Sequence, residues 1–319
     1  MGAALIVYTA WPINFGDRSV PSWNFGFDFM TIKNRVISYA RLMRLDKPIG
    51  ILLLLWPMLW GLWFAAKGVP DMIILGIFIM GTILMRSAGC VINDYADQEI
   101  DPHVERTKSR PLVTGSVAAK EALLLAAGLS FCAFLLILPL NNLTIMLSFI
   151  ALFLAASYPF TKRFFAMPQA YLGIAFSFGI PMAFAAQTGE LPMIAWLLML
   201  ATVFWVIAYD TAYAMVDKAD DLKIGIKTSA ITFDRFDVVG VMVCHGIFLV
   251  IMIWVGATQQ LGSAFYIGLA IALGLIIYQY RLIRHRDPAS CFKAFLNNNR
   301  VGAVIFMGIV IDFLATSGL

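Results

Sequence analysis

The chain has 319 residues, of which 61% are hydrophobic and only 13% are charged. Soluble globular domains are roughly half apolar and about one quarter charged, so this composition excludes an ordinary soluble domain and indicates a polytopic membrane protein. The four cysteines lie far apart without a CxxC spacing, which excludes a disulfide framework and a typical zinc site. The net charge of +4 comes from basic residues gathered in particular loops, and no nucleic-acid partner is expected.

The N-terminal extension, residues 1–33, carries no pattern that specifies a structure. No basic residue precedes Arg18, which argues against a signal peptide, and the scarcity of basic residues argues against a mitochondrial transit peptide. We expect an extension that Trp11 and Trp23 could anchor at a membrane interface, although a wrongly assigned start codon would look the same. Residues 34–319 are expected to form a single membrane-embedded domain.

The rest of the chain contains nine apolar runs that are long enough to cross a bilayer, which requires roughly 20 residues and tolerates about 17. These runs occupy residues 48–66, 72–92, 119–138, 143–160, 169–187, 192–213, 238–257, 262–281 and 301–317. Basic residues precede the first run and follow the second, fourth, sixth and eighth runs, whereas the opposite loops hold little beyond Lys67. The positive-inside rule then places the N-terminus and the basic loops in the cytoplasm. The expected fold class is an all-α, polytopic membrane helical bundle.

A first acidic cluster begins where the second apolar run is ending. Asn93, Asp97 and Asp101 follow each other at intervals of four residues, which places them along one face of a helix. Pro102 favours an end of that helix near Asp101. Carboxylates at membrane depth mark functional sites, and oxygen ligands suit a Mg²⁺ ion that shares its remaining positions with phosphate oxygens. We therefore predict these three residues and Asp94 as metal ligands.

A second acidic cluster follows the sixth run, on the same side of the membrane as the first. Asp210, Tyr213, Asp217 and Asp221 again have helical spacing, and Asp220 adds a carboxylate at the turn. Two facing groups of carboxylates would repel each other unless a cation lies between them, so we predict Asp217, Asp220 and Asp221 as further Mg²⁺ ligands. The alternative, ordinary loop charges, explains the shared face and the spacing less well.

Basic side chains near these clusters suit a diphosphate. The predicted substrate-binding residues are Arg86, Arg106, Arg110, Lys162, Arg163, Lys223 and Lys227, together with Tyr213. Arg86 differs from the others because it lies inside the second run, two helical turns before Asn93, where a charge must face a polar cavity. It could bind a substrate carboxylate or the diphosphate, or it could snorkel or pair within the bundle. These features indicate a membrane enzyme that acts on a diphosphate, with a cation-coupled transporter as the alternative from another class.

Both motifs resemble those of the UbiA superfamily of intramembrane aromatic prenyltransferases. The first cluster matches the NDxxDxxxD hallmark of that family. The second, YDTAYAMVDKADD at residues 209–221, is most similar to the subgroup that prenylates 4-hydroxybenzoate. The stretches LDKPIG at residues 45–50 and YPFTKR at residues 158–163 agree with that subgroup. The resemblance covers residues 40–315, and Gln98 departs from it because a basic residue is expected there.

The resemblance implies nine transmembrane helices around a central cavity. Because no transit peptide is evident, a bacterial inner membrane is expected rather than the less favoured mitochondrial inner membrane. It implies transfer of a polyprenyl group from a polyprenyl diphosphate to the ring of 4-hydroxybenzoate, ortho to the hydroxyl group. Mg²⁺ would be the cofactor, the chemistry would occur on the cytoplasmic side, and the product would serve ubiquinone synthesis. Related enzymes act on other aromatic acceptors, so a different acceptor is the alternative within this class.

The resemblance also implies roles for individual residues. By position, Asn93, Asp97 and Asp101 would hold one metal–diphosphate unit, and Asp217 with Asp221 would hold the other. The expected catalytic residues are Asp217 and Asp210, with phenol activation or proton removal assigned to Asp217. Either Arg163 or Arg86 would bind the carboxylate of the acceptor.

Overall fold

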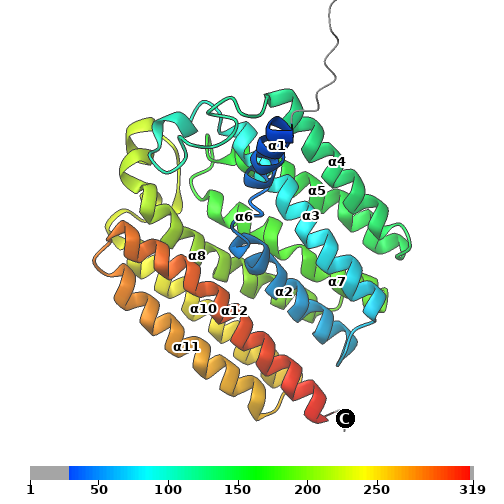
Figure 1. Cartoon of the computed structure of the whole chain (residues 1–319). Helices are drawn as coiled ribbons and strands as arrows, with labels where there is room; N and C mark the ends of the chain where they lie inside the picture. Colours follow the sequence, from blue (N-terminus) through cyan, green and yellow to red (C-terminus); the bar gives the residue numbers. More distant parts are fainter. Residues whose placement is uncertain (1–28, 317–319) are drawn as a thin grey trace, which may run out of the picture.

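The computed structural model describes residues 29–316, and every regular element within this range is a helix (Figure 1). The helices are α1 (Phe29–Leu42), α2 (Ile49–Ala66), α3 (Met72–Ala96), η1 (Asp101–His103), α4 (Ala119–Ile137), α5 (Asn142–Thr161), α6 (Pro168–Ser177), α7 (Gly179–Thr188), α8 (Met193–Ile224), α9 (Ser229–Thr232), η2 (Asp234–Phe236), α10 (Asp237–Thr258), α11 (Ser263–Ile283) and α12 (Pro288–Thr316). Nine helical segments of the described chain are long and apolar enough to cross a membrane. The predicted all-α membrane bundle is thus confirmed.

Most of the predicted extension lies outside the described residues. Helix α1 begins at Phe29, so the predicted domain boundary after residue 33 falls inside a helix. Leu42 at the end of α1 is fully buried against Val91 of α3 and Leu112, which ties this helix to the bundle.

Two of the spanning helices continue beyond the predicted apolar runs. Helix α8 extends to Ile224 instead of ending near residue 213, and α12 begins at Pro288 instead of residue 301. Hydropathy detects only the apolar part of a helix, whereas a helix continues until its backbone is capped. Gly225 ends α8 by adopting a left-handed conformation with φ of 74° and donating its N–H to the carbonyl of Asp221. The second acidic cluster is therefore helical throughout.

The end of the first cluster differs from the prediction. Helix α3 ends at Ala96 rather than near Asp101, and Asp97 is its C-cap. The chain continues through turns into the short helix η1, which contains Asp101. Asp101 is consequently not on the same helical face as Asn93 and Asp97, although the backbone N–H of Asp101 still donates to the carbonyl of Asp97 at 2.8 Å.

The fifth spanning segment is broken into α6 and α7, which meet at Phe178. Pro181 has no N–H group, so it cannot donate to the carbonyl of Ser177, and α6 ends at that residue. The two short helices still traverse the bundle as one segment of residues 168–188.

The helices form two groups with α2, α6 and α7 between them (Figure 1). Helices α8, α10, α11 and α12 pack together on one side, and α3, α4 and α5 lie on the other. The main core lies where the first group packs against α2, α6 and α7, and it contains Trp60 of α2, Trp205 of α8 and Phe248 of α10, whose rings lie 5.2–6.2 Å apart. Asn298 of α12 accepts a hydrogen bond from the indole Nε1 of Trp205 at 3.0 Å.

Helices α11 and α12 pack closely because small residues lie between them. A Cβ atom at Gly308 would lie 2.9 Å from the backbone oxygen of Ala264 and 3.4 Å from the Cα of Gly268. In a membrane, such small residues allow backbones to approach and provide much of the packing energy.

We expect Gly308→Ala to destabilise the protein by about 1–3 kcal/mol, because the added methyl group meets backbone that cannot rotate away. Thermal unfolding in detergent should show a lower midpoint. Gly274→Ala on α11 is the matched control, since a Cβ there meets nothing within 4 Å. A midpoint for Gly308→Ala equal to that of the control would contradict this account of the helix packing.

Candidate active site

A large cavity opens between the two groups of helices. Its volume is about 1540 Å³, which exceeds the roughly 300–1,000 Å³ of most small-molecule pockets. Side chains of both acidic clusters lie at its polar end, which we call the mouth. The mouth comprises Asn93, Asp97, Asp101, Asp217, Asp220 and Asp221 with Arg106, Arg110 and Lys162. The structure thus brings the two clusters, more than one hundred residues apart in the sequence, to a single cavity.

The first wall of the mouth is the end of α3. The amide Nδ2 of Asn93 donates to Oδ2 of Asp97 at 3.1 Å. The ammonium of Lys162, at the end of α5, donates to Oδ1 of Asn93 at 3.1 Å and to Oδ2 of Asp97 at 2.8 Å. One lysine from a distant helix therefore holds both predicted metal ligands.

Asp94 and Asp101 are held by arginines. Arg44 donates from Nη2 to both oxygens of Asp94, at 2.8 and 2.9 Å, and Arg110 lies 3.0 Å from the same carboxylate. Arg110 also donates to Oδ2 of Asp101 at 2.7 Å. Asp94 is only 1% exposed and is already paired with two arginines. Its main contact is therefore with these arginines, which connect α3 to the segment after α1 and to the loop after α3.

The second wall of the mouth is the extended part of α8. Nε of Arg106 donates to both oxygens of Asp217, at 3.2 and 3.0 Å, and the guanidinium lies 4.7 Å from the ring centre of Tyr213. Asp221 is buried one turn further along, whereas Asp220 pairs with Lys223 at 3.0 Å. Arg106 belongs to the loop after α3, so this ion pair connects the two walls.

The charged groups of the mouth alter each other's ionisation. Burial raises the pKa of the Asp101 carboxyl group to about 6, against the opposing effect of Arg110. Burial would favour a neutral Lys162, but the Asp97 carboxylate raises the pKa of its ammonium above the ordinary value. The pKa of Arg106 is also raised, because Tyr213 and Asp217 outweigh its burial. Arg106 and Lys162 therefore stay charged at neutral pH.

The donor set of the mouth fits a metal only if substrate supplies part of its coordination. Within residues 29–316, no group of three or more His, Cys, Asp or Glu side chains is gathered closely enough to hold a metal ion. Each wall instead offers an oxygen pair, Asn93 with Asp97 and Asp217 with Asp221. Mg²⁺ commonly takes one or two carboxylates and completes its shell with water and phosphate oxygens, so these pairs suit it.

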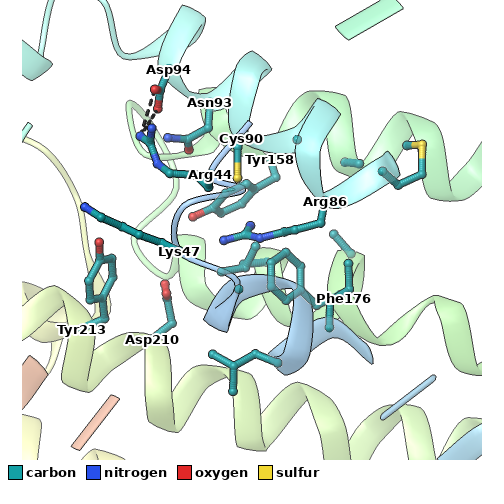
Figure 2. A pocket seen from close by; sticks show the side chains of 18 of the residues that line it. Arg44, Lys47, Arg86, Cys90, Asn93, Asp94, Tyr158, Phe176, Asp210 and Tyr213 are labelled. Carbon is teal, nitrogen blue, oxygen red and sulfur yellow. Dashed lines mark hydrogen bonds and ion pairs between the residues drawn. The ribbon is translucent and has the colours of Figure 1, made fainter. Parts of the chain in front are cut away.

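Arg86 lies deeper in the cavity and is not paired. It makes no ion pair or hydrogen bond with any described residue, and its Nε is buried without a partner. Its guanidinium carbon lies 5.3 Å from the ring centre of Phe176. Figure 2 shows Arg86 extending from α3 into the cavity toward Tyr158 and Phe176, with Asp210 and Tyr213 on the opposite wall. An unpaired buried cation of this kind is suited to an anionic ligand group.

Three predicted substrate-binding residues do not line the cavity. Arg163 donates to the backbone oxygen of Ala96 at 2.8 Å, and Lys227 donates to that of Phe164 at 3.0 Å. Lys223 is largely exposed and pairs with Asp220. The structure places these three where they stabilise loops around the mouth.

Other cavity residues were not predicted as site residues from the sequence. The sequence patterns singled out none of Arg44, Lys47 and Phe176, yet all three line the cavity. Tyr158 lines it too, and Lys162 lies 5.8 Å from its ring centre. The four-residue spacing of Tyr158 and Lys162 was the available signal, because it places both on one face of α5.

Comparison with known proteins agrees with this geometry. The model of the UbiA prenyltransferase family matches residues 54–307. The 4-hydroxybenzoate octaprenyltransferase of Nitrosospira multiformis is 73% identical over 285 residues, covering 89% of this chain and 98% of the relative. The enzyme of the same name from Nitrosomonas eutropha is 71% identical, covering 89% of this chain and 100% of the relative.

Solved structures show the same fold. The apo structure of a UbiA homolog from Aeropyrum pernix K1 has a TM-score of 0.73 and 25% identity, covering 82% of this chain and 97% of that one. The structure of a UbiA homolog from Archaeoglobus fulgidus bound to GPP and Mg²⁺ has a TM-score of 0.62 and 19% identity, covering 84% and 99%. This chain belongs to the UbiA prenyltransferase family.

Proposed function

We propose that this protein transfers the polyprenyl group of a polyprenyl diphosphate to the ring of 4-hydroxybenzoate, ortho to the hydroxyl group, in ubiquinone synthesis. The observation that carries this proposal is the 73% identity to a 4-hydroxybenzoate octaprenyltransferase over nearly the whole of that relative. The cavity supports it, since charged residues surround one end and apolar residues line most of the rest. A transporter or a different aromatic acceptor is less favoured because neither accounts for that identity.

Mg²⁺ is the proposed cofactor, with Asn93 and Asp97 on one wall and Asp217 and Asp221 on the other as its proposed ligands. Asp101 is a further proposed ligand from the loop. The bound ion would act as a Lewis acid that neutralises charge on the leaving diphosphate. Asp94 and Asp220 are proposed to support these ligands through their basic partners.

The ion pairs of the mouth suggest how a charged substrate is admitted. Lys162 now neutralises Asp97, and Arg106 neutralises Asp217. With the substrate bound, Asp97 and Asp217 would hold the cations, and Lys162 and Arg106 would be free to bind phosphate oxygens. Such preorganised donors stabilise charge that develops as the allylic C–O bond breaks. The exchange would keep Asp97 and Asp217 neutralised throughout.

The acceptor is proposed to lie between Arg86 and α8. Arg86 is the proposed partner of its carboxylate, because Arg163 is committed to the backbone of Ala96 outside the cavity. The ring would then extend toward the mouth. Asp210 makes no ion pair with any described residue, whereas Asp217 is held by Arg106, so Asp210 is the better-placed group to take a proton.

The reaction then requires an ordered set of bond changes. The C–O bond to the diphosphate breaks and leaves a carbocation-like allylic carbon. The ring carbon ortho to the hydroxyl group donates its electron pair to that carbon and forms the new C–C bond. The proton lost from the same ring carbon passes to the base. Apolar walls exclude water, which would otherwise capture the cation.

The prenyl chain is proposed to occupy an apolar extension of the cavity, which we call the arm. It lies between α4 and α5 and is lined by Ala127, Phe131, Ala133 and Phe134 of α4 and by Phe149, Ala151 and Leu152 of α5. The rings of Phe134 and Phe149 lie 5.7 Å apart. Phe131 is 60% exposed and Phe149 57% exposed although both line the arm, so we propose that the arm is open beside them and that a long chain leaves it there into lipid.

We also propose that the protein resides in a bacterial inner membrane as a single domain from residue 34 onward. Its N-terminus and mouth would be cytoplasmic. The basic loops support this orientation by the positive-inside rule. A donor with an apolar tail could then enter from the bilayer while 4-hydroxybenzoate arrives from water.

The purified protein should convert 4-hydroxybenzoate and octaprenyl diphosphate to the 3-octaprenyl product when Mg²⁺ is present. Product formation, followed by mass spectrometry, should stop with EDTA and return when Mg²⁺ is restored, because the diphosphate requires charge neutralisation to leave. Unaltered substrates in the presence of folded protein and Mg²⁺ would overturn the assignment.

Asp97→Asn should reduce kcat on the order of 100-fold and raise the Mg²⁺ concentration needed for half-maximal rate. The reason is that metal-assisted charge stabilisation contributes several kcal/mol to the rate. Glu190→Gln is the matched control, because Glu190 is exposed in the loop between α7 and α8. Normal turnover of Asp97→Asn at saturating Mg²⁺ would show that Asp97 is not a ligand.

Ala133→Trp should lower the rate with octaprenyl diphosphate by about tenfold or more while leaving the rate with geranyl diphosphate within about twofold, since overfilling a packed site costs about 1–3 kcal/mol. Leu135→Trp is the control, because Leu135 is on the same helix but outside the cavity lining. Equal losses with both donors would place the prenyl chain elsewhere.

A further inference from the structure

The start of α2 lies directly against the guanidinium of Arg86, and the residue at the contact, Gly50, has no side chain. A Cβ atom at residue 50 would lie 2.5 Å from Nη2, 2.6 Å from Nε and 3.0 Å from Cζ of Arg86. Cβ atoms essentially never approach other heavy atoms within 3.0 Å. Any other residue at position 50 therefore requires the guanidinium to move.

These distances identify the part of Arg86 that meets α2. The Cβ position is closer to both nitrogens than to the carbon that joins them, so it lies beside the Nε–Nη2 edge rather than over the flat face. Nε is buried and lacks a hydrogen-bond partner among the described residues, as expected for an edge that faces the backbone of a glycine. The outer edge, formed by the two terminal nitrogens, is the part left to face the cavity.

The backbone itself does not require glycine at this position. Gly50 is the second residue of α2, and its φ does not lie in the left-handed region. Inside helices, glycine is less favourable than alanine by about 1 kcal/mol. The feature of the site that an alanine would disturb is the far end of a flexible side chain, Arg86, rather than backbone. The fold should tolerate the substitution, whereas the guanidinium should not stay in place.

We propose that Gly50 is a positioning residue for the acceptor. It lets α2 approach the Nε–Nη2 edge and thereby holds the terminal nitrogens of Arg86 toward the carboxylate of 4-hydroxybenzoate, with Phe176 beside the guanidinium. This inference rests on the proposed function, in which Arg86 binds that carboxylate. An added methyl group would displace the guanidinium by on the order of 1 Å, because nonbonded atoms settle at about 3.5–4.0 Å. A displacement of about 1 Å at a binding group can reduce the rate by about 100-fold.

The test compares the kinetics of Gly50→Ala with those of wild type. The KM for 4-hydroxybenzoate should rise by about tenfold or more, while the KM for octaprenyl diphosphate stays within error and the thermal midpoint does not fall, because only acceptor binding is weakened. Gly76→Ala is the matched control: it is a glycine of α3 outside the cavity lining, where a Cβ meets nothing within 4 Å. Its two KM values should equal those of wild type.

A second variant, Arg86→Lys, separates positioning from a general effect on the fold. Lysine has no Nε–Nη2 edge, so adding Gly50→Ala to this background should change the acceptor KM by less than about twofold. If Arg86→Lys has too little activity for this measurement, the test relies on Gly50→Ala alone. A rise in its KM for 4-hydroxybenzoate without a rise in its KM for octaprenyl diphosphate then supports positioning.

Several results would overturn the inference. These are an unchanged acceptor KM in Gly50→Ala, an equal rise in both KM values, or the same rise in both Arg86 backgrounds. The wild-type reaction distinguishes a failure of the role of Gly50 from a failure of the proposed function. Wild-type turnover with an unaffected Gly50→Ala removes the role of Gly50 alone, whereas absence of wild-type turnover removes the acceptor and this inference with it.

Discussion

Neutralisation of carboxylates at the edge of a membrane is the constraint on which the rest of this structure depends. Asp94, Asp97, Asp101 and Asp217 are all largely removed from water, and each is paired with an arginine or a lysine. Except for Asp101 and Arg110, which lie in the same loop, these pairs join different segments. Unpaired, such charges would strongly destabilise the fold. The loop after α3, the end of α5 and the extended α8 therefore meet at one place, because their charges require each other.

The same pairing explains how one site can be both stable and ready for substrate. A basic residue that neutralises a carboxylate in the free protein can bind phosphate once a cation takes over that carboxylate. Arg86 is the exception, since its buried guanidinium has no ion-pair or hydrogen-bond partner among residues 29–316. The described part of the chain thus has basic residues paired with carboxylates at the mouth and an unpaired arginine deeper in the cavity, and these differ in the ligand they suit.

The two groups of helices contribute differently to this arrangement. The group of α8, α10, α11 and α12 is closely packed through aromatic rings, Gly308 and the Trp205–Asn298 hydrogen bond. Helices α4 and α5 leave the apolar arm between them. A rigid half can hold charged groups in register, and an open apolar half can accept chains of different lengths without specific contacts.

The sequence by itself determined the nine spans, the two acidic clusters and the family, because hydropathy, charge asymmetry and motif spacing are local properties of the chain. It also identified Arg86, since a charge within an apolar run is conspicuous. Only the tertiary structure decided the pairing of these charges: that Arg106 meets Asp217, that Arg163 turns to Ala96, and that Gly50 lies against Arg86. These contacts join residues far apart in the chain, and their geometry depends on how the helices pack, which no local pattern specifies.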